Sequence, residues 1–222
     1  MQCTCFIYDE LKYVINENFN PNYVVLANIN ALRNSGRRVF LFYTHGSLEK
    51  WLTTINFTDV HVESGHLITF LNQNFVSGII LKDIDYNYDT NLKYQVDPEF
   101  YVKFRDYMIY FKQRIRNVKI GVYVNVSNII YLSNHPTRKN AFNFSVINDE
   151  VDFYIIGFDG FNPCNDHFRD GIVPICGPNS SQTMLSKTLQ ISTIAKEKIY
   201  LELLDNPTAP DTGEKLPICK IT

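Results

Sequence analysis

Six short runs rich in apolar, β-branched or aromatic residues limit the folds that this sequence can adopt. They cover residues 5–8, 39–43, 76–85, 118–124, 151–158 and 199–204. Runs this short that do not alternate with polar residues are typical of strands buried on both faces, as in a parallel sheet. The chain therefore predicts a parallel sheet, with the segments at 76–85 and 151–158 as interior strands.

The segments between these runs carry the spacing and the end signals of helices. Residues 23–34 place apolar side chains on one face and stop just before Gly36, a residue type that favours the left-handed position after a helix. Residues 97–116 begin with an Asp-Pro pair and then repeat phenylalanine at near-helical intervals. Residues 182–197 space leucine and isoleucine in the same way. We expect three helices here.

Alternating strands and helices without a mid-chain linker predict an α/β fold. An open nucleotide-binding sheet would need a glycine-rich turn after its first strand, and residues 8–12 contain no glycine. We therefore expect a (β/α)8 TIM-like barrel over residues 1–205, followed by a loop or tail over residues 206–222 with the pattern of a short final strand. Because 222 residues are near the lower limit for such barrels, we expect it to be minimal or to lack one strand.

Charge and cysteine content exclude several classes of function. The formal net charge is -2, so no chain-wide field would draw the protein onto nucleic acid. The apolar runs are far shorter than the roughly 20 residues that span a bilayer. Five scattered cysteines lack the spacing of a zinc site. We expect no nucleic-acid partner, no membrane insertion, no metal and no cofactor.

Two of the predicted strands carry motifs of a known family. Residues 75–88, FVSGIILKDIDYNY, resemble the fourth barrel strand of glycoside hydrolase family 18, the chitinases and chitinase-like proteins, where the pattern D-x-x-D-x-D-x-E precedes a tyrosine. Residues 151–159, VDFYIIGFD, resemble that family's sixth strand, V-D-F-x-x-x-M-x-Y-D. Residues 5–9 and 198–203 are similar to its first and seventh strands. The resemblance keeps the family order along most of the chain and implies a chitinase-like barrel.

The resemblance implies a specific chemistry for the fourth strand. In the family the glutamate protonates the glycosidic oxygen, and the aspartate two residues earlier orients the substrate's acetamido group, which attacks the sugar carbon. One register of the motif places Asp83, Asp85 and Asn87 at its last three acidic positions. In that register an amide replaces the acid, and an amide cannot donate the proton.

A second register aligns Ser-Gly at 77–78 with the family's Asp-Gly and puts Ile80, Lys82 and Ile84 at the acidic positions. Alternation along a strand favours the first register, because Asp83 would then point inward while Lys82 extends from the outer face. Neither register supplies a glutamate. The resemblance therefore implies a pseudoenzyme without catalytic residues.

Other positions of the family site are also altered. The tyrosine of the sixth strand is replaced by Phe158, and the chain's one tryptophan does not lie in the final strand, where the family has the tryptophan that floors its sugar site. A lone histidine such as His45 at a strand end is more often structural than functional. The candidates for ligand binding are Asp83, Asp85, Asn87, Tyr88, Phe158, Asp159, His45 and Trp51.

Glycosylation sequons and two cysteines favour a secreted protein over a cytoplasmic one. The first residues have neither a basic segment nor an apolar region, so we expect no signal peptide in this sequence. The candidate glycosylation sites are Asn56, Asn125, Asn143 and Asn179, and the candidate disulfide joins Cys164 and Cys176.

These features predict a catalytically inactive chitinase-like protein that binds a chitin-like or N-acetylglucosamine-containing glycan, or a protein partner. One alternative is a structural, storage or assembly protein built on an inert barrel. A second alternative is a family 18 hydrolase that uses an acid outside the motif. The sequence does not indicate an oligomeric state.

We predict that Cys164 and Cys176 pair when the protein is made in an oxidising compartment, because they bracket a loop rich in Asn, Asp and Gly. Peptide mapping of the unreduced protein is expected to recover one cross-linked peptide containing both. Two alkylatable thiols at these positions would contradict the prediction.

Overall fold

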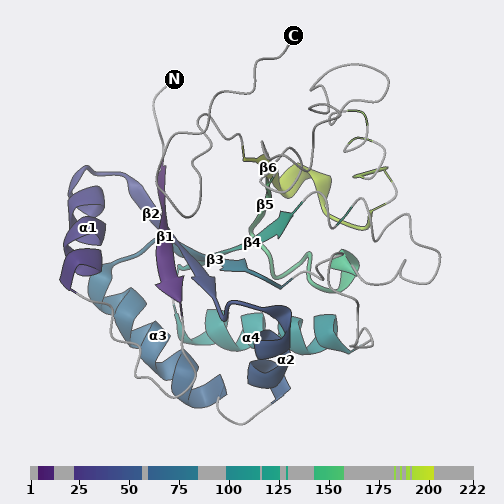
Figure 1. Ribbon diagram of the computed structural model, residues 1–222, viewed down its shortest axis with the longest axis horizontal. Coiled ribbons are helices and arrows are strands. Elements are labelled where there is room, and N and C mark those ends of the chain that lie inside the picture. Colours follow the sequence, from purple (N-terminus) through teal and green to yellow (C-terminus); the bar gives the residue numbers. More distant parts are fainter. Residues whose placement is uncertain are drawn as a thin grey trace, which may run out of the picture.

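The computed structural model of the protein is a parallel sheet with helices packed against one of its faces (Figure 1). It describes residues 5–12, 23–56, 60–84, 99–115, 117–125, 143–157 and 192–202, with the single positions 129, 183, 186, 189 and 190. None of the helices in these segments is long and apolar enough to cross a membrane.

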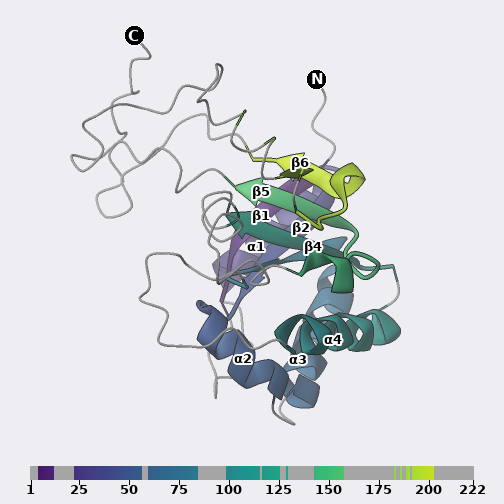
Figure 2. The ribbon, with the colours of Figure 1, turned by 90° about the vertical axis from the view of Figure 1, so that its right-hand side faces the viewer.

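Six strands form the sheet in the order in which they occur along the chain, and each neighbouring pair is parallel. Figure 2 shows this stack of strands from the side. Sequential order is the winding of a (β/α) barrel, whereas a doubly wound sheet reverses its order at a switch point. The fold is therefore a partial (β/α) barrel, as predicted. The strands are β1 (Cys5–Lys12), β2 (Arg38–Thr44), β3 (Gly78–Lys82), β4 (Lys119–Asn125), β5 (Phe153–Gly157) and β6 (Ile199–Leu201).

Within the described segments, four α-helices and two short 3-10 turns lie between the strands. They are α1 (Tyr23–Asn34), α2 (Leu48–Asn56), α3 (Val60–Asn74), α4 (Phe100–Arg114), η1 (Phe144–Val146) and η3 (Lys196–Lys198). The predictions of α1 and α4 are confirmed, but α2 and α3 were not identified from the sequence. The predicted helix over 182–197 is confirmed only in part. Positions 183, 186, 189 and 190 are helical, but residues 192–195 are not.

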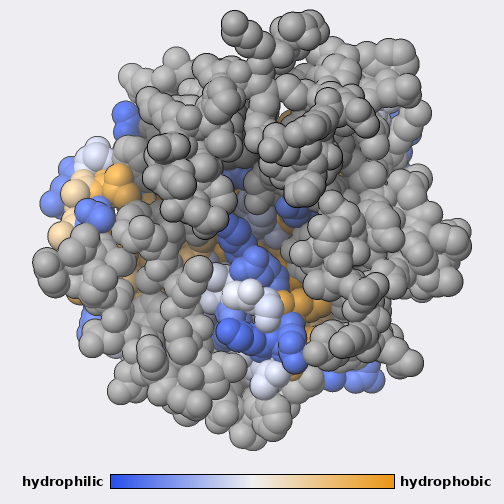
Figure 3. All heavy atoms as spheres, in the orientation of Figure 1, coloured by the Kyte–Doolittle hydropathy of each residue, from blue (hydrophilic) through white to orange (hydrophobic). Residues whose placement is uncertain are grey.

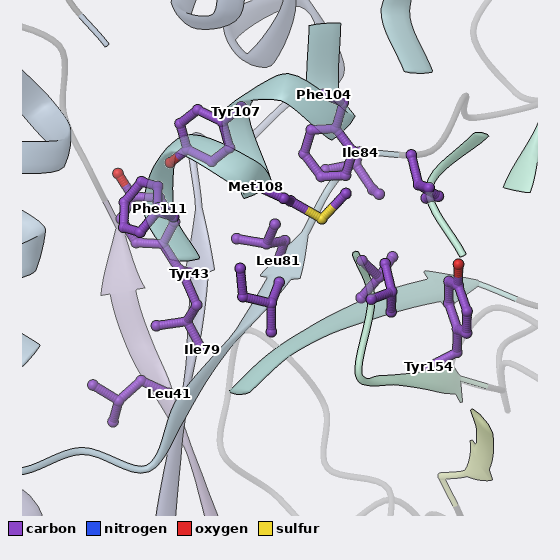
Figure 4. Packing of buried hydrophobic residues seen from close by; sticks show 14 of the residues in the cluster. Leu41, Tyr43, Ile79, Leu81, Ile84, Phe104, Tyr107, Met108, Phe111 and Tyr154 are labelled. Carbon is purple, nitrogen blue, oxygen red and sulfur yellow. The ribbon is translucent and has the colours of Figure 1, made fainter. Parts of the chain in front are cut away.

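A large apolar cluster fills the space between the sheet and the helices (Figure 4). Alternate residues of the strands, such as Leu41 and Ile79, contribute to it from the sheet. Helix α4 contributes a face of aromatic and sulfur-containing side chains, because phenylalanine and tyrosine recur at helical spacing along it. The buried residues of α4 are Phe100, Tyr101, Phe104, Tyr107, Met108 and Phe111. Every α-helix has a residue in or against this cluster, so all four cover the same face of the sheet.

The opposite face of the sheet has its own small cluster, and none of the helices in the described segments covers it. It consists of Phe40, Phe42, Ile80, Tyr123 and Ile155, with Cys5 and Phe153 packed against it. This is the inner face of the barrel, because the helices of a (β/α) barrel surround the outside.

Glycines on the inner face lie beside the aromatic rings of neighbouring strands. A Cβ atom at Gly78 would overlap the Phe40 ring, and one at Gly157 would overlap the Tyr123 hydroxyl group. A third glycine, in β4, is covered in the same way by the ring of Phe153. Large and small residues therefore interdigitate across strands, as expected for a filled barrel interior.

The start of β6 is held in place by a loop that follows η1. The Asn148 side chain accepts hydrogen bonds from the Tyr154 hydroxyl at 2.9 Å and from the backbone N–H of Ala195 at 3.1 Å. The Lys198 ammonium donates to the backbone carbonyls of Asn148 and Val151 at 2.6 and 2.8 Å. Burial also raises the pKa of the Tyr154 phenol, which therefore stays a hydrogen-bond donor.

The two segments predicted as interior strands each pair with strands on both sides, so that prediction is confirmed. The first is shorter than expected: β3 begins at Gly78 rather than at residue 76, and it ends at Lys82 rather than at residue 85. It ends there because Asp83 adopts a left-handed backbone with φ of 60°, which breaks the extended conformation.

We predict that Gly157→Ala lowers the free energy of unfolding by about 1–3 kcal/mol, because the added methyl group displaces the Tyr123 side chain. Urea denaturation would measure the loss. The matched control is Gly65→Ala in α3, where nothing lies within 4 Å of the added atom and the change is expected to raise stability by about 0.5–1 kcal/mol. Equal stability of the two variants would contradict the packing described for Gly157.

Candidate functional site

The inner face of the sheet changes from apolar to polar at the carboxyl ends of the strands. Thr44 and Lys82 are register partners at the ends of β2 and β3, and Asn125 and Gly157 are partners at the ends of β4 and β5. Glu202 directly follows β6 and lies on the same face as these residues. Carboxyl ends of parallel strands meet at one end of a barrel, which is where such folds build their sites. We call these five residues the carboxyl-end layer.

Lys82 points into the barrel. Its ammonium lies over the ring of Phe42, 5.0 Å from the centroid, and over the ring of Tyr123, 5.2 Å from the centroid. The neighbouring Leu81 belongs instead to the cluster on the helix side. The expectation that Lys82 extends from the outer face is therefore wrong, since alternation counted from the buried strand residues turns it inward.

The orientation of β3 supports the second register of the family motif. Gly78, Ile80 and Lys82 occupy the inner face, where that register places the glycine and the first two of the later acidic positions. Ile84, at the position of the glutamate, is 1% exposed and packs in the helix-side cluster. The first register was favoured because it avoids burying carboxylates, but it assumed a strand that runs on to residue 85.

Asp83 lies at the rim of the carboxyl-end layer and is anchored to β2. Its carboxylate accepts a hydrogen bond from the hydroxyl of Thr44, and that hydroxyl oxygen accepts the backbone N–H of Gly46 at 2.7 Å. Thr44 is almost fully buried. The contact fixes the Asp83 carboxylate beside the end of β3.

A second carboxylate of the layer was missed by sequence reasoning. The Tyr123 hydroxyl donates to Glu202 at 2.8 Å and thereby links β4 to the end of β6 across β5. The bond passes over Gly157, whose lack of a side chain leaves room for the hydroxyl. Only the sheet register reveals this pairing, because 79 residues separate the partners.

His45 and Trp51 are buried and support the site from the helix side. Their exposed fractions are 2% and 0%, and their rings meet edge to face with centroids 4.3 Å apart. The Trp51 indole N–H donates to the carbonyl of Lys82 at 2.8 Å, and Thr54 lies 3.4 Å from the His45 ring nitrogen. Covered in this way, the two side chains offer no surface to a ligand, and they hold the end of β3 in place instead.

Several of the candidate residues lie outside the described residues. They are Asp85, Asn87, Tyr88, Phe158, Asp159, Cys164, Cys176 and Asn179. Among the other glycosylation candidates, Asn56 ends α2, Asn125 shares the inner face with Tyr123, and Asn143 is exposed. An inward position does not suit the attachment of a glycan.

Polar and apolar groups lie side by side at this part of the molecule. Figure 3 shows hydrophilic residues next to hydrophobic ones near the centre of the face, in the region where Figure 1 shows α2 and the ends of β2 and β3. The carboxyl-end layer therefore combines a cation, two hydrogen-bonding side chains and a carboxylate above aromatic rings.

Comparisons with known proteins place this fold among chitinases and chitinase-like proteins. No protein-family model matches the chain, and no curated protein matches its sequence. The chitinase domain of the spore coat protein CotE from Clostridium difficile is similar at a TM-score of 0.64 and 14% identity, over 92% of this chain and 60% of that one. A chitinase-like agglutinin from Robinia pseudoacacia is similar at a TM-score of 0.63 and 11% identity, over 89% and 62%.

A third neighbour is a mutant of the Group II chitinase catalytic domain 2 from Ostrinia furnacalis in complex with penta-N-acetylchitooctaose. It is similar at a TM-score of 0.62 and 15% identity, over 90% of this chain and 55% of that one. The chain thus spans 55–62% of the length of these three neighbours. At these identities the similarity establishes the fold, which is the fold of chitinase barrels.

We predict that Asn143 is glycosylated in a secretory host and that Asn125 is not, because only the former is exposed. Ser145→Ala and Ser127→Ala each destroy one sequon without changing its asparagine. Mass spectrometry of the intact protein is expected to show the loss of one glycan for Ser145→Ala and no change for Ser127→Ala. A lower mass for Ser127→Ala would contradict the inward position of Asn125.

Proposed function

We propose that this protein belongs to the chitinase-like proteins of family 18 and binds a glycan without cleaving it. The observation that carries the proposal is the inner face of β3, where Ile80 and Lys82 stand at positions of the family's acids. The side chain at the glutamate position, Ile84, is turned into the helix-side core. A family 18 reaction needs a carboxylic acid within one hydrogen bond of the leaving oxygen.

The chemistry of the carboxyl-end layer supports glycan binding. Sugars are recognised by hydrogen-bonding side chains together with aromatic rings that contact the apolar faces of the pyranose. Glu202 and Asn125 supply the polar groups. Tyr200, which pairs with Ile155 on the inner face, has a ring that is 65% exposed.

The structural neighbours are consistent with this function. One was solved with a chito-oligosaccharide, and another is named an agglutinin although its fold is chitinase-like. A barrel of this fold therefore binds an oligosaccharide in one neighbour and belongs to a protein named as an agglutinin in the other. Secretion and glycosylation at Asn143 form part of the proposal.

We predict no release of reducing ends from chitotetraose above background, because absence of a general acid alone lowers the rate by about 10²–10⁴-fold. The same preparation is expected to bind a chito-oligosaccharide or a related glycan in calorimetry or on an array. The assay therefore separates a binding protein from an inert barrel.

The proposal would be overturned by cleavage that Asp85→Ala or Glu202→Gln abolishes. Either result would identify the acid of a working hydrolase. Lys119→Met, at the amino end of β4, is the control for effects of substitution in general.

A further inference from the structure

The carboxyl-end layer contains a cation that recognition of a neutral sugar does not require. Lys82 stands, in the register that the structure supports, at the position of the aspartate that orients the acetamido group in family 18. The charge at this position is therefore reversed. A carboxylate at this position would accept a hydrogen bond from the ligand. An ammonium can only donate one, so the ligand group beside Lys82 must be an acceptor.

Two aromatic faces keep the Lys82 ammonium inside the barrel. Its nitrogen lies 5.0 Å from the centroid of Phe42 and 5.2 Å from that of Tyr123. Both residues are at least 94% buried, and cation–π contacts with their rings hold the ammonium in this position. The cation is therefore held at the layer rather than extended into bulk solvent.

The remaining groups of the layer suit the rest of a sugar ring. The Tyr123 hydroxyl fixes the Glu202 carboxylate at 2.8 Å, and a fixed carboxylate accepts hydrogen bonds from sugar hydroxyls. Tyr200 is exposed on the same face, and its ring lies nearly perpendicular to that of Phe153, with the centroids 6.1 Å apart. A cation, an acceptor and an aromatic surface thus share one side of the sheet.

We propose that the glycan is acidic, with a carboxylate or sulfate group bound by Lys82, hydroxyls bound by Glu202 and a pyranose face against Tyr200. This inference rests on the proposed function as a glycan-binding protein. The inference adds the chemical class of the ligand. In this ligand an anionic group takes the place of the acetamido group as the part that the protein recognises.

The test measures binding of three tetrasaccharides by calorimetry. They are chitotetraose, which is neutral, hyaluronan tetrasaccharide, which carries carboxylates, and sulfated chitotetraose. The protein is expected to bind at least one of the acidic probes about tenfold or more tightly than chitotetraose, the gain of one charge-assisted hydrogen bond. The preferred probe tells which anionic group is recognised, and added salt is expected to weaken its binding.

Lys82→Met removes the ammonium and keeps a side chain of similar length over the two rings. It is expected to abolish the preference, so that the acidic probes bind no more tightly than chitotetraose. Lys119→Met is the matched control, since it removes the same charge at the amino end of the sheet, where Lys119 pairs with Asp152. Circular dichroism and urea denaturation would show that both variants are folded.

The two proposals fail in different ways. Equal binding of all three probes, unaffected by Lys82→Met, would overturn the acidic ligand and leave glycan binding standing. Loss of the preference in Lys119→Met as well as in Lys82→Met would also overturn it, since the effect would then reflect net charge alone. Binding of none of the probes, nor of any glycan on an array, would overturn glycan binding itself.

Discussion

The inner face of this barrel depends on the packing of aromatic rings beside glycines of neighbouring strands. Phe40, Phe153 and Tyr123 occupy the spaces that side chains at Gly78, Gly121 and Gly157 would fill. Each ring covers the strand beside its own, so a shift of register by one residue would turn the glycine beside it to the helix side of the sheet. This packing fixes the relative positions of β2 to β5, and with them the residues that reach the carboxyl ends.

The site is a consequence of that register. Tyr123 extends past Gly157 to the carboxylate of Glu202, and its ring also makes a cation–π contact with the ammonium of Lys82. One aromatic side chain therefore positions a cation from β3 and an anion next to β6. On the helix side the Trp51 indole bonds the backbone of Lys82, so the end of β3 is held from both faces of the sheet.

Much of the secondary structure was predictable because the signals are local. The bounds of α1 agree with the predicted helix at both ends, and the central residues of the strands were all identified from their apolar runs. Helices α2 and α3 were missed since threonine, asparagine and histidine interrupt their apolar spacing. The end of β3 was misplaced because the left-handed backbone of Asp83 is stabilised by Thr44, 39 residues earlier in the chain.

The sequence by itself determined a (β/α) barrel and the absence of a glutamate from the strand that resembles the catalytic strand of family 18. Both follow from residue types and their spacing along a single segment. Only the tertiary structure decided that Lys82 faces inward and that Glu202 belongs with Tyr123. The physical reason is that strand pairing sets the facing of each side chain, and pairing is a property of residues distant in the sequence.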